Sequence, residues 1–185
     1  MKSLKYWLLV LGILSCFGCS SSIHEDNRGC SFICDSIQYR VEFMSAGCVR
    51  ILSYPEGDTL VTKRLVVDVE KPTFTDYKWE ETEQAFVFCT HELLVSFDKS
   101  DEAFTFREAS TGKLLLKEKD RRKARNFKRS EVGGEQCLEV TQRFIPTDEE
   151  AIYGLGQYQN GIMNYRGKSV LLLQANMDIV NPFLI

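Results

Sequence analysis

Apolar and polar residues alternate with a period of two along much of this chain. In the stretch 37–43, Ile37, Tyr39, Val41 and Phe43 are separated by polar side chains, a pattern typical of a strand with one buried face. Further apolar runs rich in Val and Phe follow, with turn-forming residues between them. The other runs that we interpret as strands are 48–54, 60–69, 77–83, 85–90, 93–97, 104–107, 114–116 and 138–145. Strands at intervals of about eight to twelve residues predict an all-β sandwich or barrel.

The segments between these runs are polar. We interpret residues 20–35, which include three serines and Glu25-Asp26-Asn27, as a tether. The charged run 117–129 is predicted to be a solvated loop, and residues 131–135 continue that loop. A basic cluster can also bind nucleic acid, but only Phe127 interrupts this one as a stacking side chain.

The N-terminus has the pattern of an export signal. Lys2 and Lys5 precede an apolar stretch, 6–14, that is too short to span a bilayer as a helix. Gly18-Cys19 before three serines resembles a bacterial lipoprotein cleavage site. We therefore expect residues 1–18 to be a signal peptide and Cys19 to be lipidated, which would anchor the chain to a bacterial membrane on its periplasmic or surface face. Cys16 is a competing lipidation site, and an ordinary secretory signal is the alternative interpretation.

Composition and charge narrow the class of protein. The chain has 185 residues, 44% of them hydrophobic and 26% charged, which is typical of a globular domain and not of a disordered chain. Its net charge of -3 gives no overall basic character. Together with the export signal, this argues against a nucleic-acid partner.

Seven cysteines raise the question of disulfides and metals. Without Cys16 and Cys19 five remain, so at least one thiol would stay free. Cys30 and Cys34 could close a small disulfide loop, whereas Cys48 and Cys89 lie in apolar runs typical of buried thiols. No second Cys/His pair stands at zinc-ligand spacing, and we expect neither a metal nor a cofactor.

The stretch 151–185 carries the unusual chemistry. Three apolar runs, 151–153, 170–173 and 179–180, predict strands joined by tight loops. The loops hold amides, aromatics and charges that can exchange hydrogen bonds with a polyhydroxylated ligand. These residues are Gln157, Gln159, Asn160, Asn164, Tyr165, Arg166, Asn176 and Asp178.

This stretch resembles the end of the N-terminal domain of glycoside hydrolase family 31, the α-glucosidases and α-xylosidases. The resemblance rests on the blocks 153–157 (YGLGQ), 163–167 (MNYRG) and 176–183 (NMDIVNPF), with a weaker strand-by-strand similarity back to about residue 36. It implies an antiparallel, galactose mutarotase-like β-sandwich over residues 36–185, with 19–35 as lipidated cysteine and tether. Gln157, where many members carry Glu, is similar to the α-xylosidase-like bacterial branch.

The resemblance also implies which residues contact substrate. An Asp at the position of Asp178 contacts the sugar being cleaved, and Gln157 is a second candidate substrate-binding residue. The alternative for Asp178 is that it only caps its own turn. We interpret Arg166, Asn164 and Tyr165 as structural, and Trp79 as a core or partly covered residue.

Gly154 and Gly156 do not begin a dinucleotide-binding fingerprint, because Gln159 stands where the third glycine is needed. We expect them to relieve a bulge or a close backbone contact in a strand.

Two functions remain open at this stage. The first is the N-terminal domain of an exported α-glycosidase that acts on α-xylosides or α-glucosides and supports a catalytic barrel. A retaining glycosidase uses two carboxylates, which in the family lie in that barrel, and the W-x-D-M nucleophile motif is absent from these residues. We therefore expect no catalysis from the chain alone, and the apolar run 182–185 suggests a fragment with an incomplete sandwich. The alternative is a stand-alone surface lipoprotein that binds glycans.

Overall fold

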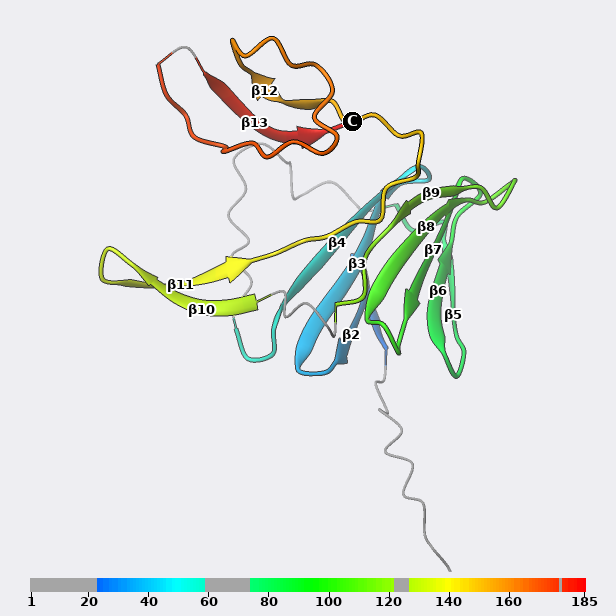
Figure 1. Ribbon diagram of the computed structural model, residues 1–185. Coiled ribbons are helices and arrows are strands. Elements are labelled where there is room, and N and C mark those ends of the chain that lie inside the picture. Colours follow the sequence, from blue (N-terminus) through cyan, green and yellow to red (C-terminus); the bar gives the residue numbers. More distant parts are fainter. Residues whose placement is uncertain (1–22, 59–73, 122–126, 177) are drawn as a thin grey trace, which may run out of the picture. The chain divides into compact units, whose positions relative to one another are not determined.

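The computed structural model describes residues 23–58, 74–121, 127–176 and 178–185 (Figure 1). Every regular element in these ranges is a β-strand, as the alternation of apolar and polar residues predicted. None of the described residues belongs to a helix that could span a membrane. The signal peptide, Cys19 and the predicted strand 60–69 lie outside the described residues.

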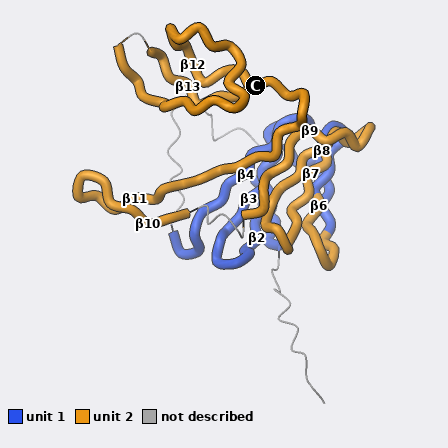
Figure 2. Tube along the Cα trace, viewed as in Figure 1, with its two compact units in different colours: residues 1–80, 88–93 blue, residues 81–87, 94–185 orange. Residues whose placement is uncertain are grey.

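The chain divides into two compact units (Figure 2). The first comprises residues 1–80 and 88–93, and the second comprises residues 81–87 and 94–185.

The first unit contains a four-stranded sheet in which consecutive strands pair antiparallel. Its strands are β1 (His24–Asp26), β2 (Gly29–Cys34), β3 (Ile37–Ser45) and β4 (Cys48–Pro55), in the order β1-β2-β3-β4. Ala46-Gly47 and Glu56-Gly57 form turns after β3 and β4, where turn residues were predicted. The sheet is therefore a simple meander.

One face of this sheet is buried because apolar residues occupy alternate positions of paired strands. Phe32 of β2 lies opposite Tyr39 of β3, with ring centroids 5.3 Å apart, and Cys30 lies opposite Val41. Phe43 stacks on Tyr77 at 5.0 Å. All five of the residues Cys30, Phe32, Tyr39, Val41 and Phe43 are at most 2% exposed, so they are the core of this sheet.

A five-stranded sheet follows in the order β5-β6-β7-β8-β9. Its strands are β5 (Lys78–Glu81), β6 (Ala85–Cys89), β7 (Leu93–Asp98), β8 (Ala103–Glu108) and β9 (Leu114–Lys117). Its buried face is aromatic: Phe97 lies 4.9 Å from Phe104 and 6.4 Å from Phe86 between ring centroids, and all three side chains are fully buried. The period-two pattern again selects which residues are buried.

Two further strand pairs complete the described residues. In the hairpin of β10 (Phe127–Val132) and β11 (Glu135–Val140), the connection is Gly133-Gly134, and both glycines have positive φ. A two-residue turn of this kind fits the twist of a hairpin. The other pair, β12 (Gly154–Gln157) with β13 (Ile179–Leu184), carries the candidate site.

The prediction of a tether over residues 19–35 is wrong for 24–34. Gly29–Cys34 is a paired strand, and its residues Cys30, Phe32 and Cys34 are buried. Cysteine packs as a small apolar residue, so C-x-F-x-C is a period-two strand pattern. An interpretation of the two cysteines as a disulfide pair overlooks their place in that pattern.

The predicted loop 117–135 is also corrected. Residues 127–132 and 135–140 are strands, with a tight turn where a longer loop was expected. Glu118 and Arg121 of the charged run are buried at 4% and 7% exposure. Arg121 binds Glu118 at 2.7 Å, and Glu118 also accepts a hydrogen bond from the backbone N–H of Phe104. Charged residues are buried when they are paired and hydrogen-bonded, so part of this run is structural.

For three of the predicted strands, the structure differs from the prediction. Val170–Leu173 contains no strand, and Leu171 and Leu173 are 80% and 58% exposed. The predicted strand 138–145 is divided: β11 ends at Val140, and Phe144 forms an isolated bridge with Glu118. Residues 151–153 precede β12, although Tyr153 exchanges two 3.0 Å backbone hydrogen bonds with Ile185.

Candidate functional site

The candidate site is built on the short antiparallel ladder of β12 and β13. Gly154 pairs with Leu184 and Gly156 pairs with Val180, so the register shifts between the two glycines. Both glycines have positive φ, and a Cβ on either would collide with a carbonyl oxygen of β13. These are the features of a β-bulge with close backbone approach, as predicted for Gly154 and Gly156.

A tyrosine side chain forms a hydrogen bond with the backbone of the bulge. Leu155, between the glycines, has a φ of 65°, a conformation that is uncommon for a side chain of this size. Its carbonyl oxygen accepts a 3.0 Å hydrogen bond from the hydroxyl of Tyr158. The ring of Tyr158 packs edge-on against Tyr165, which is 7% exposed, with centroids 6.3 Å apart. The two tyrosines therefore connect the bulge to the loop that follows it.

Asp178 immediately precedes β13. Its backbone N–H donates to the carbonyl oxygen of Ala175 at 3.3 Å, which closes a tight turn. The side chain is half-buried. Burial, followed by the charges of Tyr165 and Asp178, raises the pKa of Tyr158. No described residue donates a hydrogen bond to this carboxylate, and the side-chain cap of an Asx turn is absent among them.

Gln157 is brought close to Asp178 along the ladder. It pairs with Ile179, the neighbour of Asp178, and its side chain is exposed. Successive side chains of a strand point to opposite faces, so Gln157 and Ile179 share one face of the ladder. Both predicted substrate-binding residues thus lie at one end of the β12–β13 pair, with Asp178 one residue before the partner of Gln157.

The loop side chains that we interpreted as structural make backbone contacts. The Arg166 guanidinium donates to the carbonyl oxygens of Thr147 and Glu150, both at 2.6 Å. The amide oxygen of Asn164 accepts hydrogen bonds from the backbone N–H groups of Ile152 and Arg166. These bonds join the loop to the residues that precede β12, which confirms the structural interpretation of both side chains.

The cysteines do not form the predicted arrangement. Cys30 and Cys34 are both free thiols on one strand, and Cα atoms four residues apart in a strand are separated by about 13 Å, beyond the reach of a disulfide. Cys48 is exposed and Cys89 is half-buried, so the prediction of a buried thiol is wrong for Cys48. Among the described residues, no group of three His, Cys, Asp or Glu side chains can hold a metal ion.

Trp79 is a partly covered surface residue, as predicted. Its indole N–H donates to Glu25 at 3.0 Å, and the other carboxylate oxygen of Glu25 accepts the Tyr77 hydroxyl at 3.0 Å. The Glu25 carboxylate therefore holds the residues just before β5 and in β5 to the first strand of the chain.

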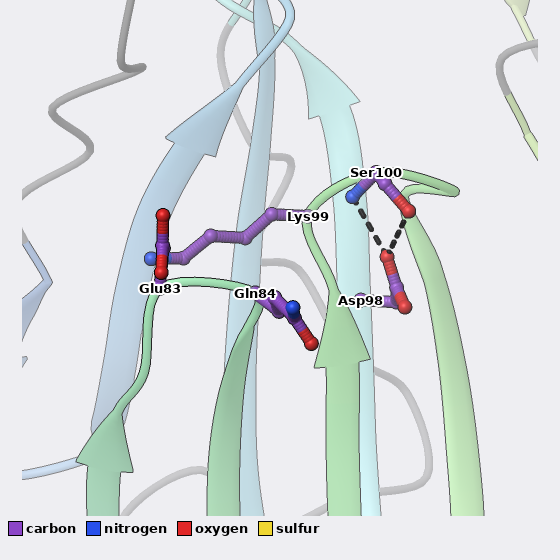
Figure 3. Close-up of a pocket in the computed structure, with 5 residues that line it drawn as sticks. All are labelled: Glu83, Gln84, Asp98, Lys99 and Ser100. Carbon is purple, nitrogen blue, oxygen red and sulfur yellow. Dashed lines mark hydrogen bonds between the residues drawn. The ribbon is translucent and has the colours of Figure 1, made fainter.

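A separate pocket of about 480 Å³ lies in the second unit, at the loops after β5 and β7 (Figure 3). Three of its lining residues, Asp98, Lys99 and Ser100, already have hydrogen-bond partners within the protein. Lys99 binds Glu81 at 2.7 Å and the carbonyl oxygen of Thr82, and one Asp98 oxygen accepts hydrogen bonds from the N–H and hydroxyl of Ser100. The pocket contains neither Gln157 nor Asp178, and we do not assign it a ligand. Its five lining residues are Glu83, Gln84, Asp98, Lys99 and Ser100.

Residues 38–181 match the family described as the glycosyl hydrolase 31 N-terminal galactose mutarotase-like domain. An α-xylosidase of Saccharolobus solfataricus is 29% identical over 165 residues, which are 81% of this chain and 21% of that protein.

Solved structures agree with this match. The chain is similar to a GH31 α-xylosidase of Xanthomonas citri at 30% identity, with a TM-score of 0.75 over 88% of this chain and 18% of that one. A GH31 α-xylosidase from a soil metagenome shares the fold at 19% identity, with a TM-score of 0.69 over 89% of this chain and 26% of that one. The chain thus spans about a fifth to a quarter of the length of these relatives.

Proposed function

Because this chain belongs to the glycosyl hydrolase 31 N-terminal galactose mutarotase-like family, we propose that it is the N-terminal β-sandwich of an exported α-glycosidase. Its substrates are α-xylosides or α-glucosides, and the O-glycosyl bond is hydrolysed in a catalytic barrel outside these 185 residues. The observation that carries this proposal is the family match over residues 38–181. The α-xylosidase relatives at 29% and 30% identity support the choice of an α-xyloside.

In this proposal the β12–β13 module lends Asp178 to the substrate pocket, and Gln157 is a second contact. A carboxylate accepts hydrogen bonds from two sugar hydroxyls, and charge-assisted bonds are stronger than neutral ones. It also adds negative potential near the oxocarbenium-like charge of the transition state. The freedom of the Asp178 carboxylate from described donors supports a role toward an external ligand.

We further propose that the protein is exported and anchored to a bacterial membrane by a lipid on Cys19. This rests on the basic, apolar and Gly-Cys-Ser pattern of residues 1–22. The predicted membrane contact is made by the lipid alone.

The test is to assay the complete natural product of the gene with an aryl α-xyloside and an aryl α-glucoside. We expect hydrolysis, with the α-xyloside preferred. Asp178→Asn should lower kcat/KM by about tenfold or more, because it removes a charge-assisted hydrogen bond to the sugar. Asp148→Asn, which changes an exposed carboxylate of the loop before β12, is the matched control and should leave kcat/KM unchanged.

The same assay distinguishes a glycosidase from the alternative, a glycan-binding lipoprotein. A product that binds xylo- or gluco-oligosaccharides but hydrolyses neither substrate would favour a glycan-binding lipoprotein. Hydrolysis that is equally fast in wild type and Asp178→Asn would contradict the sugar-contacting role of the loop and leave the glycosidase assignment intact.

A further inference from the structure

A side chain of the loop itself holds the backbone on both sides of Ile179. The Gln174 amide nitrogen donates to the carbonyl oxygen of Asp178 at 2.8 Å. Its amide oxygen accepts from the N–H of Val180 at 3.0 Å. Both bonds have ordinary lengths for N–H···O contacts, so one side chain binds the two backbone groups that flank a single residue.

This arrangement imitates the backbone of a neighbouring strand. A primary amide has one carbonyl and one N–H side, and a strand presents an N–H and a C=O from alternate residues along one edge. Gln174 binds the carbonyl oxygen of Asp178 and the N–H of Val180. These two groups have the spacing expected along the edge of β13 that does not face β12. Gln174 replaces a strand partner there, over the first residues of β13.

The turn before β13 supplies a partner for the other backbone group of Asp178, its N–H. The N–H of Asp178 is bound to Ala175 at 3.3 Å, and its carbonyl oxygen is bound to Gln174. Both backbone groups of Asp178 are thus satisfied within the loop, while its carboxylate has no described donor. Fixing the backbone fixes the direction in which the side chain leaves the loop.

We propose that Gln174 is a positioning residue that orients Asp178 for sugar binding. The inference rests on the proposed function of Asp178, but the contact itself can be tested without a sugar. Gln174 touches no substrate in this scheme and acts only through the Asp178 backbone.

The test is Gln174→Glu, studied by NMR on the full chain from about pH 3.5 to pH 7.5, across the ordinary range of a glutamic acid. A protonated Glu side chain has the donor and acceptor of Gln, so it can form both bonds. An ionised side chain still accepts from Val180 but repels the Asp178 carbonyl oxygen. We expect the Ile179 amide signal, which reports the Asp178 peptide group, to match wild type at low pH and to shift as the side chain ionises.

Gln174→Leu is the second variant and should lower the hydrogen-exchange protection of the Val180 amide by about tenfold, because one hydrogen bond is lost. Gln136→Glu is the matched control: this β11 side chain donates a hydrogen bond to Glu131 in its own hairpin, at 3.1 Å. It should leave the Ile179 and Val180 signals at their wild-type positions. Dispersed signals from β3 and β7 in the same samples show that the sheets remain folded.

Two results would overturn the contact: an Ile179 signal in Gln174→Glu that follows wild type at every pH, or unchanged Val180 protection in Gln174→Leu. A second measurement tests whether Gln174 positions Asp178. In the complete enzyme, Gln174→Leu and Asp178→Asn should lower kcat/KM non-additively, with no further loss in the double variant. Additive losses would contradict positioning, whereas an Asp178→Asn variant with full activity would contradict the proposed sugar-contacting role of Asp178 while leaving the Gln174 contact in place.

Discussion

At the scale of single residues, polar side chains of the first unit that are wholly or partly buried share a few hydrogen-bond partners. Cys30 lies 3.6 Å from the Tyr77 hydroxyl, which donates to Glu25. Burial, only partly offset by the hydrogen bond with Tyr77, raises the pKa of the Cys30 thiol to about 11. A group whose anion is this disfavoured stays a neutral thiol at physiological pH.

We predict that Cys30 resists alkylation in the native protein. Since the thiolate is the nucleophile and an ordinary cysteine has a pKa near 8.5, the raised pKa and the burial of Cys30 together should slow its reaction with iodoacetamide at about pH 8 by at least a hundredfold relative to Cys137. Peptide mass spectrometry after timed quenching measures both rates.

Denaturant provides the control, because both cysteines should then react at similar rates. Native Cys30 that is modified as fast as the exposed Cys137 would contradict the buried position of β2 and, with it, the correction of the predicted tether.

Sequence motifs identified the candidate contacts but not the residues that hold them. Asp178 and Gln157 could be named because they stand in motif blocks, and the ladder brings them to the same end of β12 and β13. Gln174 and Tyr158 were missed because their hydrogen bonds go to backbone groups. Such bonds depend on a turn and a bulge that no residue pattern specifies.

At the scale of elements, the Gly154–Gly156 bulge decides the register of the site. Gln157 lies opposite Ile179, the residue after Asp178, only while Gly156 pairs with Val180. A slip of one residue would move every side chain of β13 to the other face. The glycines therefore contribute to the site without touching a ligand.

Gly156→Ala is predicted to destabilise the β12–β13 module. The new Cβ would collide with the carbonyl oxygen of Ile179, and alanine at a φ of 111° is strained. We expect a loss of about 2 kcal/mol or more in the local free energy of opening, measured by hydrogen exchange of the β12 and β13 amides.

Gly161→Ala is the matched control. It also has positive φ, at 69°, but a Cβ there has no atom within 4 Å, so only a backbone cost of about 1 kcal/mol is expected. Equal effects of the two substitutions would argue that the close approach of the strands at Gly156 does not stabilise the module.

Strict alternation between clear turns predicted the strand Ile37–Ser45 correctly. Val170–Leu173 shows why apolar runs without alternation are unreliable: four consecutive apolar residues fit several structures, and here they lie in an irregular, largely exposed segment. Buried charge was equally hidden: Glu118 and Arg121 are only three residues apart, but their further partners Phe104 and Gln142 meet them only in the fold.

At the scale of the whole molecule, the chain is an all-β domain of a family whose relatives here are four to five times longer. Its large exposed apolar side chains concentrate between residues 132 and 185, where they include Met163, Leu171 and Ile185 at 76% exposure or more. Exposed apolar side chains gathered in one part of the sequence agree with the proposed role of supporting a catalytic barrel.

The proposed membrane anchor predicts a simple labelling result. When the full chain is expressed in a bacterium fed with radiolabelled palmitate, the protein should be labelled and should sediment with membranes. Cys19→Ser should abolish both, because the thiol of Cys19 carries the lipid in this proposal.

Cys16→Ser is the matched control and should retain the label. Loss of label in Cys16→Ser alone would move the anchor to Cys16. A wild-type protein that is exported without label would indicate an ordinary secretory signal.

The bulged ladder also has an evolutionary consequence. Residues 158–178 leave and return to the same two strands, and the register of those strands is set by glycines outside the loop. Insertions, deletions and substitutions can therefore accumulate in the loop between its structural contacts, while the strands and Gln174 keep the backbone of Asp178 in place. If the loop contacts sugar as proposed, descendants of such a domain can diversify their sugar preference there without redesigning the sheets that carry it.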